Sequence, residues 1–131
     1  MVVEHLALWT RDLERLRDFY TRWFGATANA VYESRRRQGF RSHFLTFPGG
    51  GSRLEIMAVP DLDDALYGER VGFAHVAVAI GPREAVDALC AQMRDAGVPV
   101  RSAPRETGDG YYEAVLEDPD GNLLEIMATP G

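Results

Sequence analysis

The sequence predicts an α+β fold built from two tandem βαβββ modules, and three observations support this prediction. Residues 54–60, LEIMAVP, return as residues 124–130, LEIMATP, so the chain contains an internal repeat with an offset of 70 residues. Each half carries one amphipathic helical pattern after its first apolar segment. Alternating apolar segments typical of strands surround both helical patterns. Repetition of the same order of elements indicates two copies of one module.

The first module begins with a predicted strand at 2–10, in which His5 shares a face with Val3, Ala7 and Trp9. From Leu13 the apolar residues recur every three to four positions, which predicts a helix that ends at Gly25. Three further strands are expected at 26–32, 40–47 and 53–59. The charged turn 35–39 connects the first two of them.

The second module repeats this order. We expect a strand at 73–80, a helix with Pro82 at its first position and Gly97 at its end, and strands at 98–103, 111–117 and 123–128. Module 1 then covers about 2–59, module 2 about 72–129, and residues 60–71 connect them within a single domain, 1–131. His43 maps onto Glu113 at the offset of 70, so the hairpins before the two final strands are expected to have equal lengths.

Composition narrows the range of partners. The net charge of −6 disfavours nucleic acid, because phosphate binding needs a concentrated basic face. No apolar stretch approaches the ~20 residues of a membrane span, and no signal peptide is visible at the start. Cys90 is alone in the chain and is expected to be a buried thiol. We therefore expect a cytoplasmic protein that binds neither nucleic acid nor membrane.

Four polar residues recur in register with the repeat. His5 and His75 lie on the first strands of the two modules, and Glu55 and Glu125 lie on the last strands. A carboxylate within an apolar strand must be paired, protonated or bound to a cation, because burial of an isolated charge is costly. If the two modules pair with two-fold symmetry, the four side chains meet. The sequence therefore predicts a metal site formed by His5, Glu55, His75 and Glu125.

Two imidazoles and two carboxylates suit a divalent ion such as Zn, Ni, Co, Mn or Fe. They leave coordination positions for water or for a substrate with two neighbouring oxygens. For each residue alone, an ordinary alternative exists: a buried histidine with a satisfied hydrogen bond, or an edge-strand carboxylate paired with an arginine.

The chain resembles the vicinal-oxygen-chelate superfamily, which includes glyoxalase I, extradiol dioxygenases and bleomycin or fosfomycin resistance proteins. The resemblance covers nearly all of residues 3–128. It rests on His5 with the 12–24 stretch, on RLEI at 53–56, on FAHVAV at 73–78, and on EDPDGN at 117–122 leading to LEI at 124–126. It implies paired βαβββ modules that curl a sheet around a metal-centred cavity, and it implies a homodimer.

The His, Glu, His, Glu order is most similar to that of glyoxalase I, the lactoylglutathione lyase. This resemblance implies a lyase or isomerase that acts through a metal-chelated enediolate on a small oxygenated substrate, with or without a thiol conjugate. Glu125 would be the catalytic base and Glu55 its counterpart. The chain departs from glutathione-using members, however: Trp9 replaces an arginine, and Val59 replaces an asparagine.

Two alternatives stay open at the level of the sequence. One is a non-heme iron dioxygenase with a triad of His5, His75 and Glu125, which requires that Glu55 not bind the metal. The other is a binding protein that sequesters a drug or metabolite. Under any of these readings the residues expected to line the pocket are Trp9, His43, Met57, Tyr111 and Met127. The sequence does not decide between module pairing within one chain and pairing across a dimer.

Overall fold

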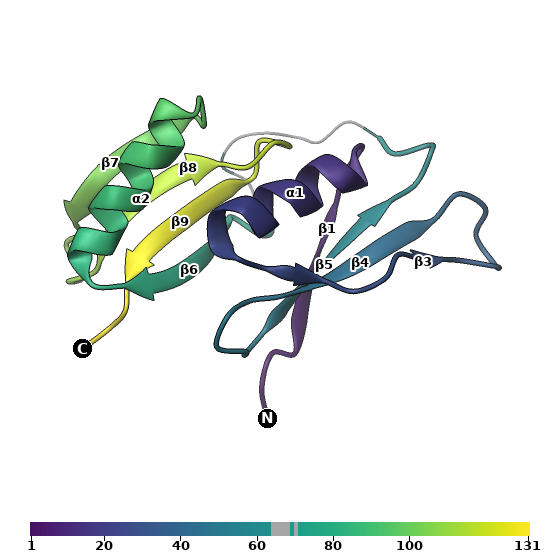
Figure 1. Cartoon of the computed structure of the whole chain (residues 1–131), viewed down its shortest axis with the longest axis horizontal. Helices are drawn as coiled ribbons and strands as arrows, with labels where there is room; N and C mark the ends of the chain where they lie inside the picture. Colours follow the sequence, from purple (N-terminus) through teal and green to yellow (C-terminus); the bar gives the residue numbers. More distant parts are fainter. Residues whose placement is uncertain (64–68, 70) are drawn as a thin grey trace. The chain divides into compact units, whose positions relative to one another are not determined.

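A computed structural model describes residues 1–63, 69 and 71–131. The chain divides into two compact units, Met1–Leu66 and Tyr67–Gly131, and the described residues of each unit form one helix and one sheet (Figure 1). Much of the connector predicted at 60–71 lies at 64–68 and 70, outside the described residues.

The described part of the first unit contains the helix α1 (Leu13–Phe24) and a mixed sheet. Its strands are β1 (His5–Trp9), β2 (Thr27–Ala28), β3 (Tyr32–Glu33), β4 (Arg41–Thr46) and β5 (Arg53–Ala58). The order β1-β5-β4-β2 places β1 parallel to β5 and β5 antiparallel to β4, while β3 pairs with β4. The predicted strand at 26–32 is therefore divided into the two short strands β2 and β3.

Both ends of α1 follow from local chemistry. The Asp12 side chain accepts a hydrogen bond from the Arg15 backbone N–H at 3.0 Å, and so caps the first turn. Gly25 ends the helix with φ of +66°, a conformation that costs glycine little. The predicted helix from Leu13 to Gly25 is confirmed.

The second unit has the same plan. It contains α2 (Arg83–Asp95) and a sheet with the order β6-β9-β8-β7, in which β6 is parallel to β9. The strands are β6 (His75–Gly81), β7 (Val100–Glu106), β8 (Tyr112–Glu117) and β9 (Leu123–Ala128). Pro82 precedes α2 as its N-cap with ψ of 170°, so the helix begins one residue later than predicted.

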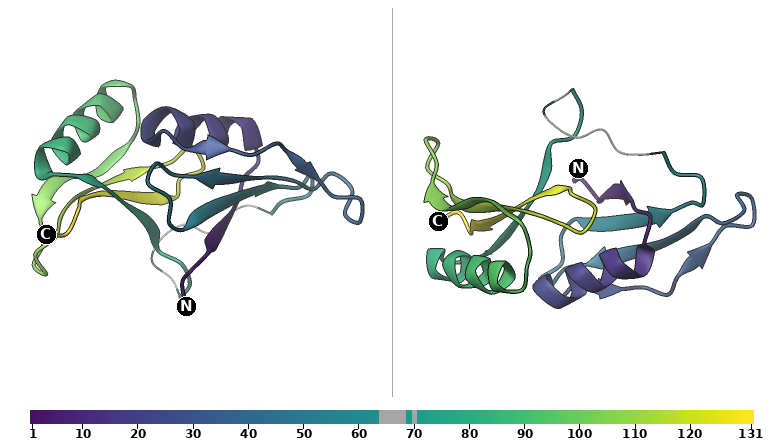
Figure 2. Two further views of the ribbon diagram at one scale, coloured as in Figure 1. Left: turned by 60° about the horizontal axis from the view of Figure 1, so that its bottom comes forward. Right: turned by 90° about the horizontal axis from the view of Figure 1, so that it is seen from above.

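In each unit the helix covers one face of the sheet and leaves the other face open (Figure 2). Leu45, Leu54 and Ile56 are buried on the helix face of the first sheet, as Leu116, Leu124 and Ile126 are on that of the second. Alternation then directs Glu55 and Glu125 to the open faces. Both sheets are curled and open, and the predicted fold of two βαβββ modules is confirmed.

The two hairpins before the final strands differ in length. Leu45 pairs with Leu54 across the first hairpin, whereas Leu116 pairs with Leu124 across the second, so the first hairpin is one residue longer. The prediction of equal hairpins is therefore wrong. Gly49, Gly50 and Gly51, all with φ between +77° and +91°, accommodate the longer turn.

No helix among the described residues is long and apolar enough to cross a membrane.

Candidate metal centre

The first unit brings His5 and Glu55 together. They lie on the parallel strands β1 and β5, where His5 pairs with Arg53 and Ala7 pairs with Glu55. On the open face of this sheet, His5 Nε2 lies 3.8 Å from Glu55 Oε1. The Glu55 side chain is 19% exposed and the His5 side chain 40%, so the pair is reachable from solvent. The His5 ring also meets the edge of Phe44, with centroids 5.1 Å apart.

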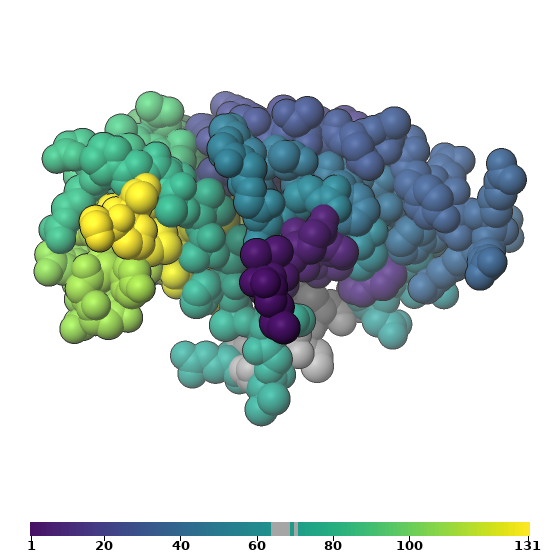
Figure 3. Space-filling model, turned by 90° about the horizontal axis from the view of Figure 1, so that it is seen from below, coloured from purple at the N-terminus to yellow at the C-terminus, as the bar shows by residue number. Residues whose placement is uncertain are grey.

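Glu4 orients the His5 ring. Its Oε2 accepts a hydrogen bond from His5 Nδ1 at 2.7 Å, and its Oε1 accepts one from Arg53 Nε at 2.8 Å. These bonds, His5 first, lower the pKa of Glu4 and keep it a carboxylate. With the proton on Nδ1, the lone pair of a neutral His5 ring lies on Nε2, the atom that faces Glu55. The N-terminal segment is exposed (purple in Figure 3), yet this carboxylate is held on both sides.

The second unit brings His75 and Glu125 together in the same way. On β6 and β9, His75 pairs with Leu123 and Ala77 pairs with Glu125, which repeats the register of the first unit. His75 Nε2 lies 3.3 Å from Glu125 Oε2, and the Glu125 side chain is 16% exposed. Ala74 stands where the first unit has Glu4, so this histidine lacks the equivalent carboxylate.

Glu125 also has an acidic neighbour, Glu113. Burial raises the pKa of Glu125, and a hydrogen bond with Glu113 raises it further, while His75 opposes the shift. Glu113 pairs with Met127 on β9, so its side chain shares the open face with Glu125. Because a raised pKa makes a carboxylate a stronger base, Glu125 is equipped to accept a proton.

The two pairs fit a divalent metal in donor type and spacing. Ligand atoms about 2.1 Å from a tetrahedral zinc ion lie roughly 3.4 Å apart, close to both of the observed N–O separations. A carboxylate on the remote nitrogen of a ligating histidine, as Glu4 is on His5, is a common feature of such sites. Within the described parts of the chain, each sheet assembles two of the four predicted ligands, and no group of three or more is assembled.

Three of the predicted lining residues share the open faces with these pairs. Trp9 pairs with Met57 two positions beyond Glu55, and Met127 holds the corresponding place beyond Glu125. Tyr111 precedes β8 and is 43% exposed. Its neighbour Tyr112 turns to the helix side of the sheet, where its hydroxyl donates to Asp87 of α2 at 2.6 Å.

His43 does not lie on the open face, and the prediction that it lines a pocket there is wrong. It pairs with Ile56 on the helix side of β5, is 5% exposed, and donates from Nδ1 to the Asn29 carbonyl at 2.8 Å. The extra residue in the first hairpin is the cause, because a shift of one residue moves a side chain to the other face of a strand. Ser42, which pairs with Met57, is the positional equivalent of Glu113.

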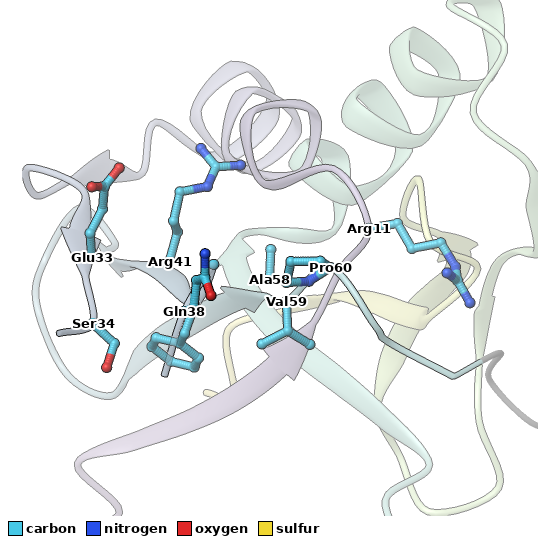
Figure 4. A pocket seen from close by; sticks show the side chains of 10 residues that line it. Arg11, Glu33, Ser34, Gln38, Arg41, Ala58, Val59 and Pro60 are labelled. Atoms are coloured by element: carbon cyan, nitrogen blue, oxygen red, sulfur yellow. The ribbon is translucent and has the colours of Figure 1, made fainter. Parts of the chain in front are cut away.

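A cavity of about 460 Å³ lies beyond the end of β5 in the first unit. Phe40, Ala58, Val59 and Pro60 form its apolar wall, and Gln38 borders it (Figure 4). The Arg11 side chain points away from the other lining residues. The Arg41 guanidinium donates to Glu14 of α1 at 2.8 Å, so it is already paired. Glu33 and Ser34 also line the cavity, so its walls are both apolar and polar.

Sequence reasoning missed Glu4 and assigned no role to Arg37. The sequence offers one indication of a role for Glu4, which stands directly before the first histidine and has no counterpart before the second. Arg37 belongs to a turn that reads as an ordinary solvated run, yet its guanidinium lies 5.7 Å from the centre of the Trp9 ring. Nothing in the sequence indicates that contact.

Comparison with known protein families gives a match over nearly the whole chain. The family model of the Glyoxalase/Bleomycin resistance protein/Dioxygenase superfamily matches residues 2–126. No curated protein sequence matches the chain.

Solved structures share the fold at low sequence identity. A glyoxylase/bleomycin resistance protein/dioxygenase domain from Frankia sp. EAN1pec has a TM-score of 0.82 and 19% identity, with 99% of this chain and 98% of that chain covered. Glyoxalase I from Zea mays has a TM-score of 0.79 and 23% identity, with 99% and 45% covered, so this chain spans less than half of the maize enzyme. Trypanothione-dependent glyoxalase I from Leishmania major has a TM-score of 0.75 and 23% identity, with 98% and 86% covered.

Proposed function

Because the chain belongs to the Glyoxalase/Bleomycin resistance protein/Dioxygenase superfamily, we propose that it is a metal-dependent enzyme of the glyoxalase I type. It acts as a lyase or isomerase on a small substrate with two neighbouring oxygens. His5, Glu55, His75 and Glu125 hold the divalent ion.

The repetition of the His–Glu pair carries this proposal. Both pairs occupy the same register positions on two parallel strands, and both face the open side of their sheet. The observed separations of 3.8 Å and 3.3 Å suit two ligands of one ion. The repeated fold by itself requires neither a histidine nor a glutamate at these positions. The pairing of Glu55 with His5 also favours four ligands over the three of an iron dioxygenase triad.

The chemistry follows from the donor set and from Glu125. A divalent ion supplies Lewis-acid stabilisation of the negative charge that develops on the substrate oxygens. Glu125 takes a proton from the substrate carbon that bears a hydroxyl next to a carbonyl, and returns it to the former carbonyl carbon. The hydroxyl proton passes to the former carbonyl oxygen, so the product is an isomer and no oxidant or reductant is needed. The raised pKa of Glu125 suits this shuttle. Glu4 keeps the His5 ring in the tautomer that leaves Nε2 free.

The proposal includes an assembly. The two units form one domain, and two copies of the chain form a homodimer with two-fold symmetry. Val71 and Phe73, next to β6, are 101% and 91% exposed, which is unusual for large apolar side chains. Light scattering of the purified protein tests the dimer. A stable monomer would remove the dimer and leave the four-ligand centre in place.

Metal content and turnover test the function. The wild-type protein is expected to contain about one Ni, Zn, Co, Mn or Fe ion per chain by mass spectrometry, and His5→Ala and Glu125→Ala are expected to lose it. Glu106→Gln is the matched control, because its carboxylate is exposed and pairs with Arg83 at 2.8 Å. Loading with each metal is followed by assay of the methylglyoxal–glutathione hemithioacetal and of analogues that lack glutathione.

The outcomes separate the candidate functions. Metal lost in both variants, with turnover of a hemithioacetal or analogue, supports the proposed enzyme. Metal without isomerase turnover, but with oxygen uptake on a catechol after iron loading, would replace it with a dioxygenase. Failure to bind any metal would overturn the site and leave a binding protein.

A further inference from the structure

The open face of the first sheet carries a cluster of aromatic rings and one cation, away from the His–Glu pair. The cluster, here called the aromatic subsite, consists of Trp9, Tyr32, Arg37 and Phe40. The Trp9 and Phe40 rings meet edge to face at 6.2 Å and 90°, and Phe40 meets Tyr32 at 6.3 Å and 70°. Edge-to-face contacts hold these rings in fixed orientations.

The subsite remains open despite these contacts. Trp9 is 43% exposed and Tyr32 is 56% exposed, even though the Trp9 ring already contacts Arg37 and Phe40. Phe40 also forms part of the wall of the 460 Å³ cavity at the end of β5, with Val59 and Pro60 beside it. The aromatic surface therefore borders a hollow of the size that small molecules occupy.

Arg37 gives the subsite a charge preference. Its guanidinium lies 5.7 Å from the Trp9 ring centre and 4.0 Å from Asp61, and its side chain is 56% exposed. One exposed ion pair at this distance leaves most of its five N–H donors available. Arg35 and Arg36 precede it in the same turn, and these three positive charges outnumber the two negative charges of Glu33 and Asp61. A ligand with an anionic group therefore matches the charge of this subsite.

The position of Trp9 relates the subsite to the metal centre. Trp9 follows His5 by four residues on β1, so the two Cα atoms lie on the order of 13 Å apart along the strand. A molecule that reaches both places must be elongated.

We propose that the aromatic subsite binds the far end of the substrate, a planar ring that carries a carboxylate or another anionic substituent. The ring lies on Trp9 and against Phe40, and its anionic group pairs with Arg37. This inference rests on the proposed function for the other end of the molecule, but binding of the ring itself needs only the first unit.

The test uses the two tryptophans of the chain as reporters. The full-length protein, with the metal it carries, is labelled with ¹⁵N and titrated with 1-naphthoate while the two indole N–H signals are followed. The Trp9→Leu and Trp23→Phe variants assign the signals. Trp23, on α1, lies under Arg22 instead and serves as the internal control. We expect a saturable shift of the Trp9 signal and an unchanged Trp23 signal.

Variants define the ligand. We expect Trp9→Leu to raise the Kd for naphthoate roughly tenfold, as loss of a stacking surface does. Arg37→Gln is expected to weaken the binding of naphthoate several-fold and to leave the binding of the neutral analogue 1-naphthalenemethanol unaffected. Arg36→Gln is expected to change the affinity for neither compound. Hexanoate, which has a carboxylate but no ring, is expected to bind much more weakly than naphthoate.

The metal-site variant His5→Ala separates the two proposals. Naphthoate binding that persists in His5→Ala supports the subsite whether or not the metal proposal holds. Loss of naphthoate binding in His5→Ala, an unchanged Kd in Trp9→Leu, or no saturable shift at Trp9 would overturn it. Shifts of the Trp9 signal that follow protein concentration without ligand would also overturn it, by showing that copies of the chain cover this surface.

Discussion

At the scale of single residues, Glu4 distinguishes the two halves of the candidate metal centre. Its carboxylate accepts hydrogen bonds from His5 Nδ1, at 2.7 Å, and from Arg53. In the second unit Ala74 stands at this position, so His75 lacks such a partner. The first histidine is therefore fixed in orientation before any ion binds, and the second is fixed less. A carboxylate behind a ligating histidine improves metal affinity by that ordering and by raising ligand basicity.

Replacement of Glu4 should therefore weaken metal binding and leave the fold intact. We expect Glu4→Ala to raise the Kd for zinc by about 10- to 100-fold, and Glu4→Gln, which still accepts a hydrogen bond, to have a smaller effect. Isothermal titration calorimetry measures the Kd, with Glu106→Gln as the exposed-carboxylate control. Equal affinities of Glu4→Ala and the wild-type protein would contradict the role of Glu4.

Glu125 predicts a pH dependence of stability in the metal-free protein. Because burial raises its pKa above the ordinary 4.5, the folded state holds this proton more tightly than the unfolded state does. The resulting stability is fully present below pH 4.5 and is lost as pH rises through the folded pKa. The side chain introduced in Glu125→Gln does not ionise. The free energy of unfolding of this variant, relative to that of the wild-type protein, should therefore increase as pH rises from 4 to 7.

Urea unfolding in the presence of a chelator, at several pH values, measures this difference. Glu106→Gln provides the comparison for loss of an exposed charge, since its side chain is 58% exposed. A constant difference between Glu125→Gln and the wild-type protein across the range would show that Glu125 ionises as freely in the folded state as in the unfolded chain.

At the scale of elements, two local devices place the site strands. The Asp12 cap sets the start of α1, the helix that packs on the face of β5 opposite Glu55. In the second unit, Asp118 is 3% exposed, and its Oδ1 accepts the backbone N–H groups of Asp120 and Asn122. This network closes the turn before β9 and thereby sets the register of Glu125.

Removal of the Asp12 cap should destabilise the first unit without touching the site. We expect Asp12→Ala to lower the free energy of unfolding by about 1 kcal/mol, the usual contribution of such a cap. Asp18→Ala is the control, because Asp18 lies within the helix and its side chain is 67% exposed. Chemical denaturation measures both variants. A loss in Asp18→Ala equal to that in Asp12→Ala would indicate an effect of charge and not of capping.

At the scale of the whole molecule, the central prediction is that two His–Glu pairs form one centre. An ion that binds only the folded state stabilises it by about 2.7 kcal/mol at 100 times its Kd. We expect the wild-type protein to gain this stability, and His5→Ala and His75→Ala each to lose nearly all of it. Thermal unfolding with and without added zinc measures the gain. If each variant kept the stabilisation from its remaining pair, the two units would hold separate sites.

Several features of the fold and site could be predicted from the sequence because they depend on local pattern. The repeat at an offset of 70 residues indicated two modules, and the three-to-four spacing from Leu13 located α1. Period-two alternation placed Glu55 and Met57 on one face of a strand, as found. Within a single strand or helix, the spacing of residues alone decides which side chains share a face.

The tertiary structure decided the features that depend on pairing between segments. One extra residue in the hairpin before β5 moved His43 to the helix side, although the repeat had aligned it with Glu113. The contacts of Glu4 with His5 and Arg53, of Glu113 with Glu125, and of Arg37 with Trp9 also depend on side-chain directions that no periodicity specifies. The sequence by itself determined which residue types stand in each strand; strand register, which a change of one residue in a turn inverts, decided which of them can act together.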